Sequence, residues 1–297
     1  PHAEWTGGIA GLVRTMALEL PEVTSRFIAL SKGRVDVDRL AQAVAMEILE
    51  GGADLDIAID SSGNRTAPFF ENAAALSGPE GEKARLEEGS VLLVSGGARG
   101  VTAICLEELA RAGKYRFAIL GRTDSDFAPA WAEGRKTEGE LQSAYIASEK
   151  AAGHTPTPAE ARSAAQSVNA ARETRATLDA LKTAGSEVLY FPCDLKDQGD
   201  VSMAVSMVRS HFKHIDGVIH AAGVLADKKI AEKTDAQFNS VFDTKVAGLH
   251  HLLEATRGDV LKVLCFFGSV AGRAGNPGQA DYAMANEALN HLANALW

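Results

Sequence analysis

The sequence predicts an α/β protein whose main part is a doubly wound parallel sheet, and three observations carry this prediction. From about residue 90 onward, short apolar runs alternate with longer stretches in which apolar residues recur at helical spacing. A glycine-rich turn directly follows the first of these apolar runs. Before it, residues 71–90 form a polar stretch with Gly, Pro and Ser that sets apart an earlier α/β segment.

The earlier segment is predicted to be a smaller α/β subdomain over residues 1–88. Its expected elements are a helix over 8–20, a strand over 25–31, a helix over 39–50 capped by Asp38, and a strand over 54–60. No strand in this segment is followed by a glycine fingerprint.

The main part, residues 89–297, is expected to alternate strands and helices. The strands are predicted near 91–95, 117–120, 188–194, 216–223 and 263–269, and the helices near 101–112, 199–212 and 235–256. Such an alternation is typical of a parallel sheet with helices on both faces.

An insertion interrupts this alternation at about residues 123–169. It is too long for an ordinary connection in an α/β unit, which takes about 2–6 residues. Thr157-Pro158-Ala159-Glu160 has the pattern of a capping box with proline at the first helical position. The insertion is therefore predicted to be helical, with a helix that can run to Gly185.

Composition limits the classes of function. A chain of 297 residues with 46% hydrophobic content can bury one or two cores, and its net charge of −9 argues against nucleic-acid binding. No run approaches the roughly 20 apolar residues of a membrane span. Cys105, Cys193 and Cys265 stand singly in apolar stretches. This predicts reduced core thiols, no metal site and a cytoplasmic protein.

The glycine-rich turn has the sequence SGGARGVT over residues 95–102 and opens a helix. Without Cβ atoms in the way, backbone N–H groups there can approach a pyrophosphate, as in a Rossmann-type dinucleotide site. The alternative is a tight strand-to-helix connection with no ligand, which the flanking strands make less favourable. The residues expected at the cofactor are Gly96, Gly97, Ala98, Arg99, Gly100 and Val101.

The end of the second strand bears on the choice between NAD and NADP. An NAD enzyme places a carboxylate there to bind the ribose 2′-hydroxyl, whereas this chain has Gly121, Arg122 and Thr123. A guanidinium and a hydroxyl suit a 2′-phosphate. The position predicts NADPH, with a solvated loop charge as the alternative for Arg122.

Further candidates end the third and fourth strands, at the sheet edge where ligands of open α/β sheets bind. Asp194 can accept a hydrogen bond from the adenine amine, and small residues after His220 let the backbone approach a cofactor. Each is also compatible with ordinary packing. The candidates in these two segments are Asp194, Leu195, His220, Ala221, Ala222 and Gly223.

Four polar residues have the chemistry that ketone reduction needs. A phenol donates a proton near neutrality only if a nearby cation lowers its pKa from about 10, and Tyr282 and Lys245 can form that pair. Asn286 lies one helical turn after Tyr282, and Ser269 can donate a second hydrogen bond to the carbonyl oxygen. Taken singly, each of the four is also compatible with a polar residue that has no part in a reaction.

Together these segments resemble the short-chain dehydrogenase/reductase superfamily, specifically the ketoreductase domains of polyketide synthases and polyunsaturated fatty acid synthases. The similar segments are SGGARGVT, GRT, CDL, HAAGVLAD, KVAGLHHL and FFGSVAGRAGNPGQADYAMAN. Most members of the superfamily have Tyr-x-x-x-Lys, whereas here Asn286 occupies the lysine position and Lys245 lies on the preceding helix. The resemblance implies that residues 1–88 form a truncated, cofactor-free Rossmann-like subdomain.

The resemblance also implies a reaction. Hydride would pass from NADPH to the 3-oxo group of an acyl chain on an acyl carrier protein, within a multidomain synthase, while Tyr282 protonates the oxygen. Ser269 would orient the carbonyl, Lys245 would lower the tyrosine pKa, and Asn286 would position Lys245 or a water. The alternatives are a dehydrogenase or epimerase of a free small molecule, and a non-catalytic NADPH-binding module.

The sequence departs from the family pattern at Thr102 and in where it ends, and it keeps part of a motif linked to stereochemistry. Thr102 replaces the last glycine of the usual fingerprint, which should affect helix packing more than phosphate contact. Leu225 and Asp227 keep two positions of the Leu-Asp-Asp motif of relatives that give the R alcohol, so an R product is expected. The chain stops inside a helix-like stretch at Trp297, and we expect it to be a piece of a longer polypeptide that carries the substrate lid.

Overall fold

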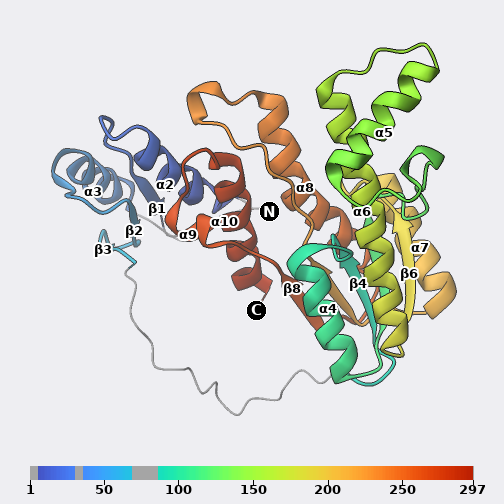
Figure 1. Ribbon diagram of the computed structural model, residues 1–297. Coiled ribbons are helices and arrows are strands. Elements are labelled where there is room, and N and C mark those ends of the chain that lie inside the picture. Colours follow the sequence, from blue (N-terminus) through green and yellow to red (C-terminus); the bar gives the residue numbers. More distant parts are fainter. Residues whose placement is uncertain (1–5, 31–35, 69–85, 297) are drawn as a thin grey trace. The chain divides into compact units, whose positions relative to one another are not determined.

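The computed structural model describes residues 6–30, 36–68 and 86–296 of the chain (Figure 1). Their contacts divide the chain into two compact units. The first unit comprises the described residues of Pro1–Lys83, Gly223–Ala247 and Gly268–Trp297. The second comprises those of Ala84–Ala222 and Gly248–Phe267. The boundary predicted near residue 88 follows chain order and stays a prediction, because these units follow contacts instead.

A five-stranded parallel sheet forms the centre of the second unit. Its strands are β4 (Val91–Ser95), β5 (Arg116–Gly121), β6 (Glu187–Pro192), β7 (Gly217–His220) and β8 (Val263–Phe266). They lie in the order β6-β5-β4-β7-β8, and every pair is parallel. The chain moves outward from β4 in one direction and then in the other, so the order switches between β4 and β7. The predicted doubly wound sheet is confirmed, and its switch point is where such sheets bind ligands.

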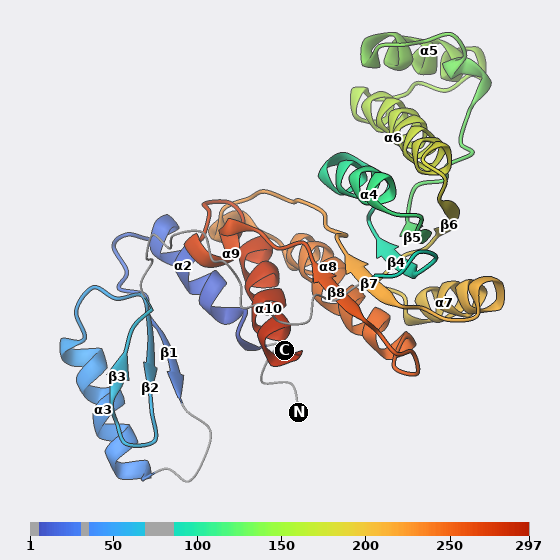
Figure 2. The ribbon, with the colours of Figure 1, turned by 90° about the horizontal axis from the view of Figure 1, so that it is seen from below.

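Apolar residues of β4 alternate between the two faces of the sheet. Val91 and Leu93 face a core shared with α7 (Gln198–Phe212), and Leu92 and Val94 face a core shared with two other helices. Those helices are α4 (Gly100–Ala112) and α6 (Pro158–Thr183), which lie across the sheet from α7 in Figure 2. All five residues of β4 are buried, as expected for a central parallel strand.

The insertion after β5 contains a short 3₁₀ helix, η1 (Ala130–Ala132), then α5 (Glu138–Ala151) and the first half of α6. The capping box predicted at Thr157 is present, since its hydroxyl accepts from the Glu160 N–H and Glu160 accepts from the Thr157 N–H. A second capping box starts α5. The insertion has a small core of its own, formed by Ala132, Leu141, Ala165 and Val168.

The first unit begins with α2 (Ile9–Glu19), β1 (Phe27–Leu30), α3 (Val37–Glu50), β2 (Asp56–Ile59) and β3 (Arg65–Thr66). β1 and β2 are parallel, and β3 pairs antiparallel with β2. The predicted cap Asp38 is wrong. Asp36 has extended backbone and accepts from the N–H groups of Asp38 and Arg39, so α3 starts two residues earlier than expected.

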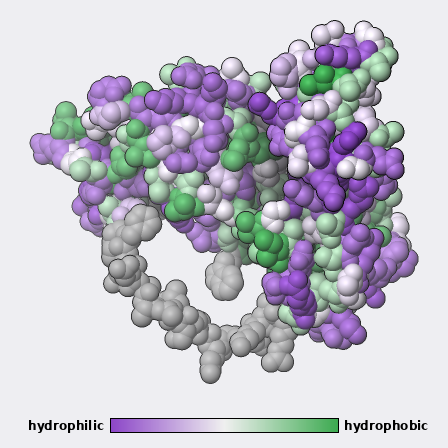
Figure 3. Space-filling view, in the orientation of Figure 1, coloured by the Kyte–Doolittle hydropathy of each residue, from purple (hydrophilic) through white to green (hydrophobic). Residues whose placement is uncertain are grey.

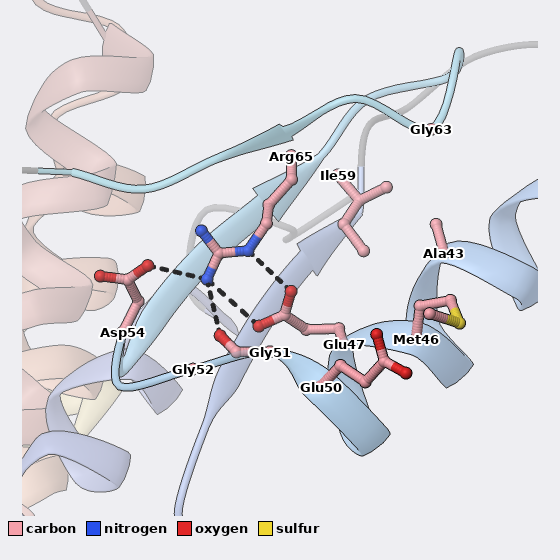
Figure 4. A pocket seen from close by; sticks show the side chains of 10 residues that line it. All are labelled: Ala43, Met46, Glu47, Glu50, Gly51, Gly52, Asp54, Ile59, Gly63 and Arg65. Carbon is pink, nitrogen blue, oxygen red and sulfur yellow. Dashed lines mark hydrogen bonds and ion pairs between the residues drawn. The ribbon is translucent and has the colours of Figure 1, made fainter.

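Charged residues join the end of α3 to β3 (Figure 4). Glu47 is buried and makes ion pairs of 2.7 Å with Arg65 and 2.9 Å with Arg26. Hydrogen bonding from Arg65 holds the pKa of Glu47 below its usual range. A pocket of about 440 Å³ borders this network. Its polar groups largely satisfy one another, because Arg65 also binds the Gly51 carbonyl and Asp54.

Two helices from the end of the chain belong to the same unit. They are α9 (Val270–Ala274) and α10 (Ala280–Leu296), and both lie beside α2 in Figures 1 and 2. A Cβ atom on Gly8 would lie 2.5 Å from the Met284 carbonyl oxygen, and one on Gly11 would lie 2.5 Å from the Ala283 oxygen. α2 therefore crosses α10 at a distance that only glycine allows.

The surface of the molecule is mixed, with hydrophilic residues over most of the face in Figure 3.

The exposure of the cysteines differs from the prediction of three buried thiols. Cys193 is buried, whereas Cys105 and Cys265 are exposed, so the prediction of three core thiols is wrong for two of them. Cys105 lies on α4, and Cys265 lies on β8, the last strand in the order of the described sheet. Among the described residues, no helix combines the length and the apolar character that crossing a membrane requires.

Candidate active site

The glycine turn between β4 and α4 is shaped by close packing and left-handed backbone. Gly96 has φ of 73°, and a Cβ there would lie 2.6 Å from the Ala222 Cα at the end of β7. A Cβ on Gly97 would lie 2.5 Å from a Val94 methyl carbon. Gly100 has φ of 62°, but a Cβ there would meet no atom within 4 Å. Gly96 and Gly97 are thus required by the fold, while Gly100 borders open space.

The start of α4 is suited to an anion. Its N-cap residue, Arg99, has extended backbone and its side chain makes no capping hydrogen bond. The first N–H groups of the helix therefore have no capping side-chain acceptor, and they carry the positive end of the helix dipole. A glycine turn followed by an uncapped helix fits the pyrophosphate of a dinucleotide.

The predicted 2′-phosphate position follows β5. Arg122 is exposed, and the carbonyl of Thr123 accepts from the Tyr190 hydroxyl at 2.7 Å. Burial raises the pKa of Tyr190, which keeps this donor protonated. A Cβ on Gly121 would lie 2.7 Å from the same hydroxyl. Tyr190 thus holds the backbone beside Arg122, a role that its sequence pattern did not indicate.

The ends of β6 and β7 show how the remaining cofactor candidates are held. Asp194 accepts from the Lys196 N–H at 3.1 Å, and the buried Leu195 receives a hydrogen bond on its carbonyl from His251. The His220 ring is fully buried and lies 2.7 Å from the Ser95 hydroxyl of β4. The His220 ring therefore packs inside the sheet, and the backbone after it is bound to the neighbouring strands, since the Ala221 N–H donates to the Ser95 carbonyl and the His220 carbonyl accepts from the Phe267 N–H.

Lys245 and Tyr282 lie together, as predicted. Lys245 is on α8 (Asp235–Ala255), and its Nζ is 5.7 Å from the centroid of the Tyr282 ring on α10. This distance is within the range of a cation–π contact. Lys245 is only 3% exposed, and burial lowers the pKa of its ammonium to about 8. It is therefore still a cation at neutral pH.

Gly223 makes room for this lysine. A Cβ there would lie 3.2 Å from the Lys245 Cε, so a larger residue would press on the aliphatic stem. Gly223 follows β7, which places the lysine next to the segment that begins there. The sequence predicts that Gly223 lets the protein backbone approach a cofactor, which stays a prediction, and the structure shows a contact with Lys245 at this position.

Asn286 is placed one turn after Tyr282. It is fully buried, and its amide nitrogen donates to the Tyr282 carbonyl at 2.7 Å. Its Oδ1 is also buried and has no hydrogen-bond partner among the residues that the structure describes. An unmet buried acceptor costs about 1–3 kcal/mol, so the position favours a donor such as an ammonium or a water.

Ser269 caps α9. Its Oγ accepts from the Ala271 N–H at 3.2 Å, and its backbone is extended. A hydroxyl that accepts in this way still has its own hydrogen to donate. The residue is half-buried.

Comparison with known proteins decides the family. The family model described as KR domain matches residues 90–296. The chain belongs to the ketoreductase (KR) domain family. This family lies in the short-chain dehydrogenase/reductase superfamily, whose reductases depend on NAD(P).

Relatives of this ketoreductase include much larger proteins. It is 35% identical over 96% of its length to a polyunsaturated fatty acid synthase protein of Thraustochytrium sp., and 27% identical over 95% to polyketide synthase PksL of Bacillus subtilis. It spans only 10% and 5% of these two proteins. A ketoreductase domain from the bacillaene assembly line has a similar fold, with a TM-score of 0.69, 23% identity, and coverage of 98% of this chain and 57% of that one.

The ketoreductase chain also has contacts at the start of α10 that sequence patterns missed. Asp281 makes a buried ion pair of 2.8 Å with Lys233, which also donates to the Ala226 carbonyl. Asp227 accepts from Gln279, and Leu225 is 62% exposed. The Leu225–Asp227 segment is thus tied to the turn before Tyr282. These pairs are about 50 residues apart, so no local periodicity indicates them.

Within the described ranges, no three His, Cys, Asp or Glu side chains are grouped so that they could hold a metal ion.

Proposed function

We propose that this ketoreductase chain reduces the 3-oxo group of an acyl chain carried on an acyl carrier protein, giving a 3-hydroxyacyl group. The observation that carries the proposal is the buried Lys245 ammonium beside the Tyr282 ring, with the open acceptor of Asn286 on the same helix as the tyrosine. A buried cation next to a phenol is the arrangement that proton donation to an alkoxide requires.

Each residue has a proposed task. Tyr282 donates its proton to the carbonyl oxygen as negative charge develops there. Lys245 favours the phenolate that remains, because its charge is held in a buried environment where electrostatic interactions are strong. Ser269 donates a hydrogen bond to the same oxygen and orients it. Asn286 accepts from Lys245 or from a water that leads to it.

We propose NADPH as the cofactor, which supplies the hydride when bound. The uncapped start of α4 and the glycine turn before it support a pyrophosphate there. Arg122 supports the 2′-phosphate of NADPH, because no carboxylate stands at the end of β5 to bind a free ribose hydroxyl. Asp194 and the backbone of residues 220–222 are proposed for the adenine and nicotinamide ends.

The proposed partners follow from the names of the relatives, which are synthases. We propose that the acyl chain arrives on a phosphopantetheine arm and that other domains of the same synthase surround this one. A cytoplasmic location is proposed on the three cysteines, all of which are free.

Replacing Tyr282 by phenylalanine tests the proposal. Full-length protein is mixed with NADPH and a 3-oxoacyl thioester, and turnover is followed by NADPH absorbance and product analysis. Tyr282→Phe should lower turnover by about 10²- to 10⁴-fold and leave NADPH affinity unchanged, since only a hydroxyl is lost. Tyr145→Phe, on the insertion helix α5, is the matched control. Near-native turnover in Tyr282→Phe would mean that another group donates the proton.

A further inference from the structure

One carboxylate holds two loops that lead to the catalytic residues. Glu19 is the last residue of α2, and its Oε2 accepts from the Ile230 N–H at 2.7 Å. Its Oε1 accepts from the Gly278 N–H, also at 2.7 Å. Ile230 follows the Leu225–Asp227 segment, and Gly278 lies four residues before Tyr282. All of these residues belong to the first compact unit.

The two loops also contact each other directly. The Lys228 N–H donates to the Gly278 carbonyl at 2.9 Å, so Gly278 is bound through both its N–H and its carbonyl. Lys233 then joins the first loop to Asp281 at the start of α10. Glu19 adds to this set two bonds that come from the N-terminal segment of the chain. It therefore links α2 to α10, the helix that carries Tyr282.

The placement of Glu19 is unfavourable for α2 itself. A negative charge at the C-terminal end of a helix opposes the macrodipole, and a neutral or basic residue would suit that end better. The two oxygens are instead each used by a backbone N–H more than 200 residues away. Charge-assisted bonds of this kind are about twice as strong as neutral ones. The carboxylate thus serves the loops rather than the helix.

We propose that Glu19 is a positioning residue for the reduction. It fixes the loop that carries Leu225 and Asp227 and the turn before Tyr282, so that this loop and the proposed proton donor keep one relative geometry. This inference rests on the proposed ketone reduction. It gives α2, which carries none of the proposed reacting groups, a defined part in the turnover.

The test compares Glu19→Gln and Glu19→Ala with Glu22→Gln in the full-length protein. Glu22 is an exposed carboxylate three residues later and is the matched control. The amide of Glu19→Gln keeps one acceptor and places N–H groups against the second donor, so kcat should fall about 10-fold; Glu19→Ala should fall about 100-fold. NADPH affinity should stay within about twofold, because the glycine turn is unchanged, and the enantiomer ratio of the alcohol should decrease.

Three results would overturn the inference. The first is a Glu19→Gln protein with unchanged kcat and enantiomer ratio. The second is a lower melting temperature with normal kcat per folded molecule, which would make Glu19 merely structural. The third is an equal loss in Glu22→Gln. Wild-type and Tyr282→Phe proteins run in the same assay separate the two ideas: an inactive wild type, or an active Tyr282→Phe, contradicts the proposed reaction itself, whereas a normal Glu19→Gln beside these controls contradicts only the positioning role.

Discussion

Burial lowers the pKa of Lys245, and the direction of this shift leads to a prediction about stability. The pKa of Lys245 is about 8 in the folded chain, against the ordinary 10.5 of an exposed lysine. The folded state therefore binds fewer protons than the unfolded state between pH 8 and 10.5, and stability from this group rises with pH through that window. Below pH 8 both states are protonated, and the full cost of the buried charge is present.

Lys245→Met should therefore stabilise the nucleotide-free protein at pH 7, by up to about 3 kcal/mol, while it lowers turnover. The gain should shrink as the pH rises above 8. Urea unfolding at pH 7 and pH 9.5 measures it, with the exposed Lys229→Met as control. A loss of stability at pH 7, or a difference that does not change with pH, would contradict the assigned cause.

Arg122 makes the cofactor prediction. Arg122→Ala should weaken NADPH binding by about 10- to 100-fold, since a charge-assisted contact to phosphate contributes about 1.5–3 kcal/mol. NADH binding should change little, because it lacks the 2′-phosphate. Titration of both nucleotides by fluorescence measures the ratio, and Arg111→Ala on the exposed face of α4 is the control. Equal affinity of the unmutated protein for the two nucleotides would rule out the assignment.

At the scale of elements, the glycine turn after β4 packs closely against the segment after β7 at Gly96. Gly96→Ala combines a left-handed backbone, which costs an L-residue about 1–2 kcal/mol, with a Cβ 2.6 Å from Ala222. Gly134 has nearly the same φ, 71°, but a Cβ there meets nothing within 4 Å. We expect Gly134→Ala to lower the unfolding free energy only by this backbone cost. Gly96→Ala should lower it by more and should bind NADPH poorly. Equal unfolding free energies for the two variants would show that the close approach is not restrictive.

The sequence indicated most elements, and its failures have simple causes. Strands of four to six apolar residues, a glycine turn and a complete capping box are local signals, and they predicted the parallel sheet and α6. β3 has only two residues, which is too short for an alternating pattern. Asp36 and Asp38 are both acceptable caps, and only the backbone of Asp36 decides between them.

At the scale of the whole molecule, the product stereochemistry can be predicted. Leu225 and Asp227 resemble the segment of relatives that give the R alcohol, and Asp227 accepts from Gln279 just before Tyr282. We expect mainly the R 3-hydroxyacyl product, measured by chiral chromatography after release from the thioester. Asp227→Ala should erode the excess, whereas Asp227→Asn keeps an oxygen acceptor and should retain more of it. A mainly S product would contradict the assignment.

What the sequence could not indicate is the set of long-range contacts around the site. Tyr282, Lys245, Ser269 and Asn286 were found because a carbonyl reduction needs those chemical groups and because the segments resemble a known family. Glu19, Lys233 and Asp281 act through partners 48 to 259 residues away. Single pairs at such separations leave no periodic trace, so only the folded chain identifies them.

The glycine-lined crossing of α2 and α10 has a consequence for protein engineering. A chimera that joins the first 88 residues of one synthase domain to the rest of another would combine α2 of one protein with α10 of the other. If the first segment of such a chimera had alanine in place of Gly8 or Gly11, the methyl group would press against a main-chain oxygen of α10, within two residues of Tyr282. Functional hybrids should therefore exchange α2 and α10 together, even though these helices lie at opposite ends of the chain.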